Sequence, residues 1–358
     1  MGICDATRDE VMRNTTMRRI LVLSVLIVAV QGCSSAAISP DDSDFRHQIS
    51  GEVLPWTNEK FDSGDDKFTF AVFSDLTGDE RDRVFEIAVA QLALLRPEFI
   101  INVGDLIEGG TEDTGEIDRQ WSSFNERAER ATAPLFYVGG NHDLNNIVLR
   151  DAWNARYGRS YYDFVYRNTL FLVLDTEDNT PARIQEMFQA RAKAIEVLET
   201  AGWDAFVQTE YFTMPEHNAG NISAEQSQYF RDVVAANPDV RWTFLFMHKA
   251  PWKRADMATF VAIEEALQDR SYTVFNGHVQ AYEYEARRGR DYIRLATTGG
   301  FHNSREGRAM DHVALVTVSE RGVDIANLLM EGILDKTGHI PLDGDDVCFD
   351  PEACKAAE

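Results

Sequence analysis

The sequence predicts an α/β fold in which helices cover mixed β-sheets. Between Phe68 and Asn276, short apolar runs that are typical of buried strands alternate with segments whose apolar residues recur at helical spacing. After Asn276, alternating apolar and polar segments follow one another with turns between them, which is typical of antiparallel strands. Strand–helix alternation followed by a run of strands indicates a sandwich of mixed sheets.

The elements can be placed in order along the chain. The main apolar strands are expected at Phe68–Phe73, Phe99–Val103, Leu135–Val138, Trp242–Met247 and Tyr272–Asn276. Tyr161–Tyr166 and Leu170–Asp175 are expected to pair as a hairpin, and the late strands are Val279–Glu285, Tyr292–Thr297, Val313–Val318 and Val323–Leu328. Helices are expected at Arg83–Leu95, within Thr111–Ala133, and at Ile147–Tyr157, Ser223–Asn237 and Ala258–Leu267. Thr180–Met214 interrupts the alternation of strands and helices. We interpret this segment as a helical insertion that caps the functional site formed at the strand ends.

Composition limits the possible partners. The chain has 358 residues, and its formal net charge is 35 − 59 = −24. A nucleic-acid partner is disfavoured because phosphate binding needs a basic face. The hydrophobic fraction of 44% suits a globular protein with a substantial core.

The N-terminal region predicts export. Arg18 and Arg19 precede the apolar run Ile20–Val30, which is too short to span a bilayer comfortably. The run leads into Gly32-Cys33 and resembles a bacterial lipoprotein signal, in which Cys33 would become the lipidated first residue. Ordinary signal cleavage and a retained anchor are the alternatives. We expect a lipid-anchored protein of the periplasm or outer membrane, with the membrane contacted only through Cys33.

The predicted domain organisation follows from these segments. The leader is 1–33, a polar linker is 34–66, the main folded domain is 67–333 with its insertion at about 180–214, and a tail is 334–358. Cys348 and Cys354 lie six residues apart in the tail, and in an oxidising compartment they could close a disulfide. A metal pair is the alternative, but no His or Cys partner is nearby in sequence.

Each of the five main strands ends at a residue of the metal-ligating type. Functional groups commonly lie on loops at strand ends, and carboxylate, amide and imidazole ligands together suit borderline divalent metals. The residues are Asp75, Asp105, Asn141 with His142 and Asp143, His248, and His278.

These blocks, in this order, resemble the calcineurin-like metallophosphoesterases. The family blocks are Asp-x-His, Gly-Asp-x-x, Gly-Asn-His-Asp/Glu, a lone His and Gly-His-x-His. Here they appear as Asp75-Leu76-Thr77, Gly104-Asp105-Leu106-Ile107, Gly140-Asn141-His142-Asp143, His248 and Gly277-His278-Val279-Gln280. The resemblance runs from about Lys67 to Leu329 and implies a four-layer αββα sandwich.

The resemblance also implies a role for each residue. Asp105 would bridge two divalent metals, drawn from Mn, Fe, Zn or Mg. Asn141, His248 and His278 would complete the second metal site, and Asp75 would hold the first metal with Asp105. His142 would contact the phosphate or protonate the leaving group, with Asp143 orienting it.

The sequence departs from the family pattern at two positions of the first metal site. Thr77 and Gln280 stand where the family has histidines, so each is a possible oxygen ligand or no ligand at all. Oxygen ligands would shift the preference of this site toward Mg, Mn or Ca. His302 and His312 lie near the late strands and could replace the missing imidazoles, although core or surface placement is the simpler expectation.

The expected function is metal-dependent hydrolysis of a phosphate monoester or diester by metal-activated water. The substrate would be a phosphorylated small molecule. The first alternative is a degenerate family member, with one metal or none, that serves as a binding or scaffold lipoprotein. A third possibility is a metal-dependent hydrolase that acts on a non-phosphate ester or a nucleotide sugar.

Overall fold

The structure is a computed structural model that describes residues 45–51, 53–59, 67–351 and 354–355. The predicted leader and its Cys33 therefore lie outside the described residues. Within the described part of the chain, no helix is both long and apolar enough to cross a bilayer.

Two mixed β-sheets form the centre of the domain. The seven-stranded sheet has the order β1 (Phe45–His47), β5 (Tyr162–Tyr166), β6 (Thr169–Val173), β7 (Trp242–Phe246), β8 (Tyr272–Asn276), β10 (Arg290–Arg294) and β9 (Glu283–Arg287). The five-stranded sheet has the order β12 (Gly322–Leu329), β11 (His312–Ser319), β2 (Phe68–Phe73), β3 (Phe99–Asn102) and β4 (Leu135–Phe136). Parallel ladders join β2 to β3 to β4 and β6 to β7 to β8 to β10. The remaining ladders are antiparallel.

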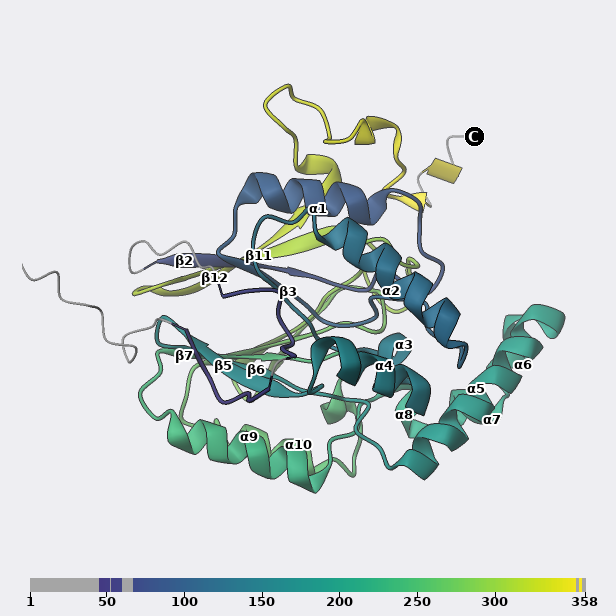
Figure 1. The fold of residues 1–358 in the computed structure, drawn as a ribbon, viewed down its shortest axis with the longest axis horizontal. Coiled ribbons are helices and arrows are strands. Elements are labelled where there is room, and N and C mark those ends of the chain that lie inside the picture. The colour runs from purple at the N-terminus through teal and green to yellow at the C-terminus, as the bar shows by residue number, and fades with distance from the viewer. Residues whose placement is uncertain (1–44, 52, 60–66, 352–353, 356–358) are drawn as a thin grey trace, which may run out of the picture. The chain divides into compact units, whose positions relative to one another are not determined.

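Helices cover both outer faces of this sandwich, so the predicted αββα architecture is confirmed (Figure 1). The outer face of the five-stranded sheet packs against α1 (Val84–Leu95), α2 (Thr114–Ala128) and α4 (Ile147–Tyr157). The outer face of the seven-stranded sheet packs against α9 (Ala224–Ala236) and α10 (Ala258–Ala266). Ser223 is the N-cap of α9, because its Oγ accepts a hydrogen bond from the Gln226 N–H.

Phenylalanine rings fill the space between the two sheets. Phe70 and Phe99 stack with ring centroids 5.0 Å apart, and Phe171 and Phe244 meet them from the opposite sheet at 5.4 and 5.0 Å from Phe70. All four side chains are fully buried. Burial on this scale fixes the two sheets against each other, which holds the strand ends in register.

The domain begins earlier in the sequence than predicted. Residues 34–66 were expected to be a linker, but within them β1 pairs with β5, and Trp56 is only 4% exposed. The Trp56 ring lies 5.3 Å from Phe45 and 5.7 Å from Phe136, at the edge of the inter-sheet core. Apolar burial therefore draws this segment onto the sandwich, and the folded domain includes Phe45 onward.

The predicted strand at Val279–Glu285 is also corrected. The structure has β9 only from Glu283, and the residues before it form a loop. His278 and Gln280 adopt φ values of 74° and 57°, which lie in the left-handed region and outside the range of a regular strand. These backbone angles turn both side chains out of the strand pattern.

Between β6 and β7, the insertion consists of α5 (Pro181–Ala201) followed by the short helices α6 (Trp203–Phe206), α7 (Glu210–Thr213) and α8 (Pro215–Asn218). Figure 1 shows α5, α6 and α7 together at one end of the sandwich. The insertion therefore stands beside the strand ends that carry the predicted site.

Candidate metal centre

The ends of parallel strands bring the predicted ligands of the second metal site together. Asp105 follows β3, His248 follows β7 and His278 follows β8, and their ligand-type atoms all lie within 4.8 Å of one another. The amide oxygen Oδ1 of Asn141, the first residue of α3 (Asn141–Leu144), lies 3.1 Å from His248 Nε2. Carboxylate, amide oxygen and two imidazoles form a donor set that suits a borderline divalent cation.

Backbone carbonyls orient both histidines toward this centre. His248 Nδ1 donates to the Val103 carbonyl at 2.8 Å, which leaves Nε2 facing Asp105 Oδ2 at 3.1 Å. His278 Nε2 donates to the His217 carbonyl at 2.7 Å, which leaves its Nδ1 free to ligate. Metal-ligating histidines commonly make such a second hydrogen bond, which fixes the tautomer and the ring orientation.

Electrostatics at this centre favour a positive charge. Burial alone would lower the pKa of His248, but the adjacent Asp105 carboxylate outweighs burial and raises the pKa to about 9. Burial would likewise raise the pKa of Asp105, yet the charge of His248 holds it well below its usual range. The proton on His248 thus compensates the Asp105 charge, and a bound cation would displace that proton and take over its role.

Two motif glycines are required by close packing around the ligands. A Cβ on Gly104, which has φ of 99°, would lie 2.7 Å from His248 Nδ1. A Cβ on Gly140 would lie 2.3 Å from Asp105 Oδ1. Both positions therefore exclude any side chain, because either Cβ would push a ligand away.

Asp75 lies beside this centre, outside the group of atoms within 4.8 Å. Its buried carboxylate accepts hydrogen bonds from the His278 N–H at 3.1 Å and from Ser74 Oγ at 2.5 Å. Burial raises the pKa of Asp75 to about 7, the Asp105 charge acts in the same direction, and His248 opposes both.

Thr77 and Gln280, the two departures from the family pattern, contact each other. Gln280 Nε2 donates to the Thr77 backbone carbonyl at 2.9 Å. Both side chains are buried, and within the described residues neither Thr77 Oγ1 nor Gln280 Oε1 has a hydrogen-bond partner. Buried polar atoms are nearly always paired, so these two unpaired oxygens are available to an oxygen-preferring cation.

The expected role of Asp143 is corrected. Asp143 was expected to orient His142, but its carboxylate accepts hydrogen bonds from the backbone N–H groups of Gly140, Asp105, Leu106 and Ile107. It thereby fixes the loop that carries Asp105. His142 is oriented instead by the Glu108 carbonyl, which lies 2.7 Å from Nδ1.

A cavity of about 1310 Å³ opens above the centre. His142, His278 and Gln280 line it near the predicted ligands, and Trp203 and His217 of the insertion line another part. The insertion therefore forms part of the wall of this cavity, in agreement with the interpretation that it caps the site.

The two late histidines do not replace the missing imidazoles. His312 is buried at the start of β11, where its Nε2 accepts a hydrogen bond from the Ala296 N–H at 3.0 Å. His302 lines the cavity, and its Nε2 lies 3.3 Å from a carboxylate oxygen of Asp311.

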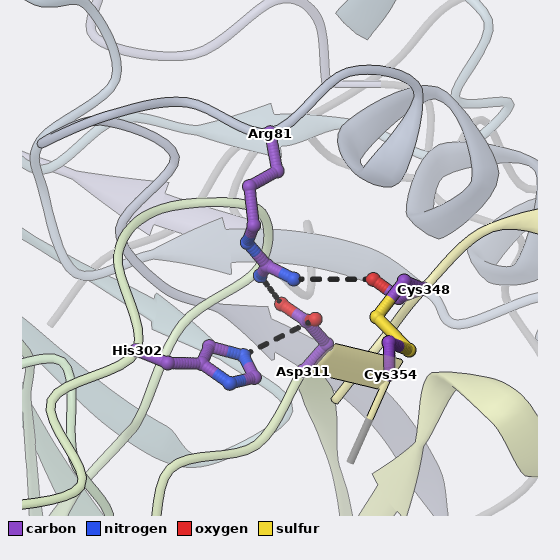
Figure 2. The surroundings of a disulfide bond; sticks show 5 residues. All are labelled: Arg81, His302, Asp311, Cys348 and Cys354. Carbon is purple, nitrogen blue, oxygen red and sulfur yellow. Dashed lines mark hydrogen bonds and ion pairs between the residues drawn. A yellow bond between two sulfur atoms is a disulfide. The ribbon is translucent and has the colours of Figure 1, made fainter. Parts of the chain in front are cut away.

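Arg81 connects the cavity rim to the C-terminal tail (Figure 2). Its guanidinium donates to Asp311 at 2.5 Å, to the Gly300 carbonyl at 3.0 Å and to the Cys348 carbonyl at 3.5 Å. Cys348 is disulfide-bonded to Cys354, as the sequence predicts. Sequence reasoning missed Arg81 and Asp311, since their pairing spans 230 residues and no local pattern marks it.

Comparison with known proteins identifies the family. Residues 68–282 match the family described as calcineurin-like phosphoesterase. Because this match spans more than half of the chain, the protein belongs to the calcineurin-like phosphoesterase family. No curated protein matches the sequence closely enough to count as a relative.

The chain is similar to several solved structures at low sequence identity. A dimetal phosphatase from Danio rerio is 14% identical, with a TM-score of 0.51 over 73% of this chain and 98% of its own. GAP50, described as the anchor in the inner membrane complex of Plasmodium, is 12% identical, with a TM-score of 0.45 over 77% and 87% of the two chains. The purple acid phosphatase PPD1 from yellow lupin (Lupinus luteus) is 12% identical, with a TM-score of 0.46 over 73% and 51%.

Proposed function

We propose that this protein hydrolyses a phosphate monoester or diester of a small molecule in a metal-dependent reaction. The observation that carries the proposal is the convergence of Asp105, Asn141, His248 and His278 beneath a cavity, in a chain of the calcineurin-like phosphoesterase family. The donor types, their shared centre and the carbonyls that orient both histidines all fit a divalent cation.

The residues around the centre have different proposed roles. Asp105, Asn141, His248 and His278 would hold the cation, which when bound supplies Lewis-acid polarisation of a phosphoryl oxygen. His142 donates its Nδ1–H to the Glu108 carbonyl, so Nε2 is the atom left to hold or move a proton at the leaving oxygen. Asp143 keeps the Asp105 loop in place through the backbone N–H groups it accepts from.

We further propose that Asp75, Thr77 and Gln280 give the first metal site a preference for cations that bind oxygen ligands, such as Mg, Mn or Ca. The two unpaired oxygens, Thr77 Oγ1 and Gln280 Oε1, support this proposal. The two sites would then differ in chemistry: two imidazole nitrogens and two oxygens at one, and oxygen ligands alone at the other.

The alternative function is a binding protein that has lost catalysis. The observation in its favour is that Gln280 bonds to the Thr77 backbone and Asp75 to the His278 N–H, so these groups are held without any cation. Against it stand the complete second-site donor set and the cavity-facing His142.

Measuring the rate of hydrolysis after metal removal and metal re-addition distinguishes a hydrolase from a binding protein. The chain would be stripped with a chelator and assayed on an aryl phosphate and a bis-aryl phosphate, with Mn²⁺, Zn²⁺ or Mg²⁺ restored one at a time. We expect no turnover in the stripped chain and recovery with at least one cation. Equal rates with and without metal, or no turnover under any condition, would contradict the proposal.

We also propose that the protein acts outside the cytoplasm as a lipoprotein anchored through Cys33. The Cys348–Cys354 disulfide supports an oxidising compartment. Blocking the lipoprotein signal peptidase should leave a larger precursor in the membrane fraction. A mature product of unchanged size would show that another route processes the chain.

A further inference from the structure

A cluster of aromatic rings on the insertion lines the cavity and is joined to the metal centre through the His217 backbone carbonyl. His278 Nε2 donates to the His217 carbonyl, the His217 ring lies 4.8 Å from Phe212, and Phe212 lies 6.1 Å from Trp203. Phe206 lies 5.3 Å from Trp203 and 5.7 Å from Phe212. We call Trp203, Phe206, Phe212 and His217 the aromatic wall, and all four side chains line the cavity.

Two large rings in this cavity remain exposed. Trp203 is 48% exposed and Phe301, on the loop after β10, is 53% exposed, although both line the same cavity as His142 and His278. Arg305 lies over the Trp203 ring at 5.7 Å and connects the Phe301 loop to the aromatic wall. Exposed aromatic rings inside a concave site mark a place where a ligand buries apolar surface.

The insertion that carries Trp203 and the loop that carries Phe301 are each held in place by hydrogen bonds within the protein. On the insertion side, Arg183 of α5 donates to the two carboxylate oxygens of Glu216 in α8 at 3.2 and 2.7 Å, and Arg254 lies 3.5 Å from the same carboxylate. On the other side, the Phe301 N–H donates to the Gly78 carbonyl at 3.1 Å. Preorganised rings lose little entropy when a ligand packs on them.

The polar lining of the same cavity restricts what can bind there. Two ion pairs also line it: Lys253 lies 2.9 Å from Glu285, and Arg294 lies 2.9 Å from Glu283. A long aliphatic chain would place apolar carbons against these charges, whereas a flat ring with polar edges can stack on aromatic faces and leave its edges to them.

We propose that the cavity binds phosphate esters whose alcohol part carries a flat aromatic ring, and that Trp203 and Phe301 bind that ring. The inference rests on the proposed hydrolysis for its reaction, because the phosphate must reach the centre at Asp105 and His278. The segment that carries the aromatic wall reaches the centre, since the His217 backbone carbonyl accepts a hydrogen bond from His278 Nε2.

Binding of non-hydrolysable phosphonates tests the proposal without requiring turnover. Calorimetric titration of the metal-loaded full chain would compare a naphthylmethyl phosphonate with an alkyl phosphonate of equal carbon number. We expect the aryl compound to bind more tightly. Trp203→Ala and Phe301→Ala should each weaken aryl binding by roughly three- to tenfold and leave alkyl binding unchanged. Trp203→Phe should restore much of the loss.

Tyr284→Ala is the matched control, because Tyr284 is an equally exposed ring, at 56%, that does not line the cavity. This variant should bind both compounds as the parent chain does. Equal aryl and alkyl affinities, or aryl binding unaffected by both cavity variants, would overturn the proposal. Aryl selectivity without turnover of any ester would support the ring site and contradict the proposed hydrolysis, so the two failures are distinguishable.

Discussion

Gln280 and Thr77 occupy the positions where a metallophosphoesterase usually carries imidazoles, and here they bond to each other. Replacing Gln280 by histidine would exchange an amide for a ring nitrogen at the first site. We expect Gln280→His to tighten binding of Zn²⁺ or Mn²⁺ at that site by about tenfold or more, since imidazole suits these cations better than an amide oxygen does.

Titration calorimetry of stripped protein with Zn²⁺ measures this change. Gln228→His, at an exposed position on α9, controls for a new histidine elsewhere. Stoichiometry and affinity identical to those of the parent chain would show that Gln280 is not at a metal site.

The sequence predicted that Asp105, Asn141, His248 and His278 lie together, and the structure places them so, because each follows an apolar strand in a recognisable block. Their role as metal ligands stays a prediction. The sequence was not sufficient to predict their hydrogen bonds. Gln280 and Thr77 are separated by 203 residues, and the role of Asp143 depends on backbone N–H groups from a neighbouring strand end. Such contacts exist only once the sheets have formed.

At the level of elements, β1 and Trp56 belong to the domain. Trp56→Ala should lower the free energy of unfolding by about 3–5 kcal/mol, the usual cost of deleting a buried large aromatic side chain. Denaturant unfolding of the purified chain measures it. Tyr284→Ala serves as the control, and we expect a change within about 0.5 kcal/mol because its ring is 56% exposed on the edge strand β9.

A negligible effect of Trp56→Ala would restore the prediction that 34–66 is only a linker. That prediction was wrong because β1 spans just Phe45–His47 within a polar stretch, too short to show a periodicity. By contrast, the hairpin β5–β6 and the helices α1, α4, α9 and α10 were predicted, because each is long enough for its apolar spacing and turn residues to identify it.

At the scale of the whole molecule, the fold brings together segments that the sequence keeps far apart. The alternation of strands and helices predicted a mixed sandwich, but it did not predict that β2 would lie between β3 and β11 or that β10 would lie between β8 and β9. Strand order follows from which apolar faces pack together across the phenylalanine core, a property of the assembled sheets.

The contacts of the C-terminal tail also form only in the folded chain. The Cys348–Cys354 spacing predicted a disulfide, but its attachment through Arg81 to Asp311 and to the cavity rim follows only from the tertiary structure (Figure 2). The tail thus helps to hold the loop that presents Phe301 and His302.

The most direct measurement is metal content per chain, taken together with hydrolysis of an aryl phosphate, for the parent protein and for His248→Ala. His339→Ala, at an exposed site in the tail, is the control. We predict that the parent and His339→Ala retain a divalent cation and turn over the ester, and that His248→Ala loses both. A His248→Ala variant that keeps the metal and the parent rate would contradict the assignment of the centre to Asp105, Asn141, His248 and His278.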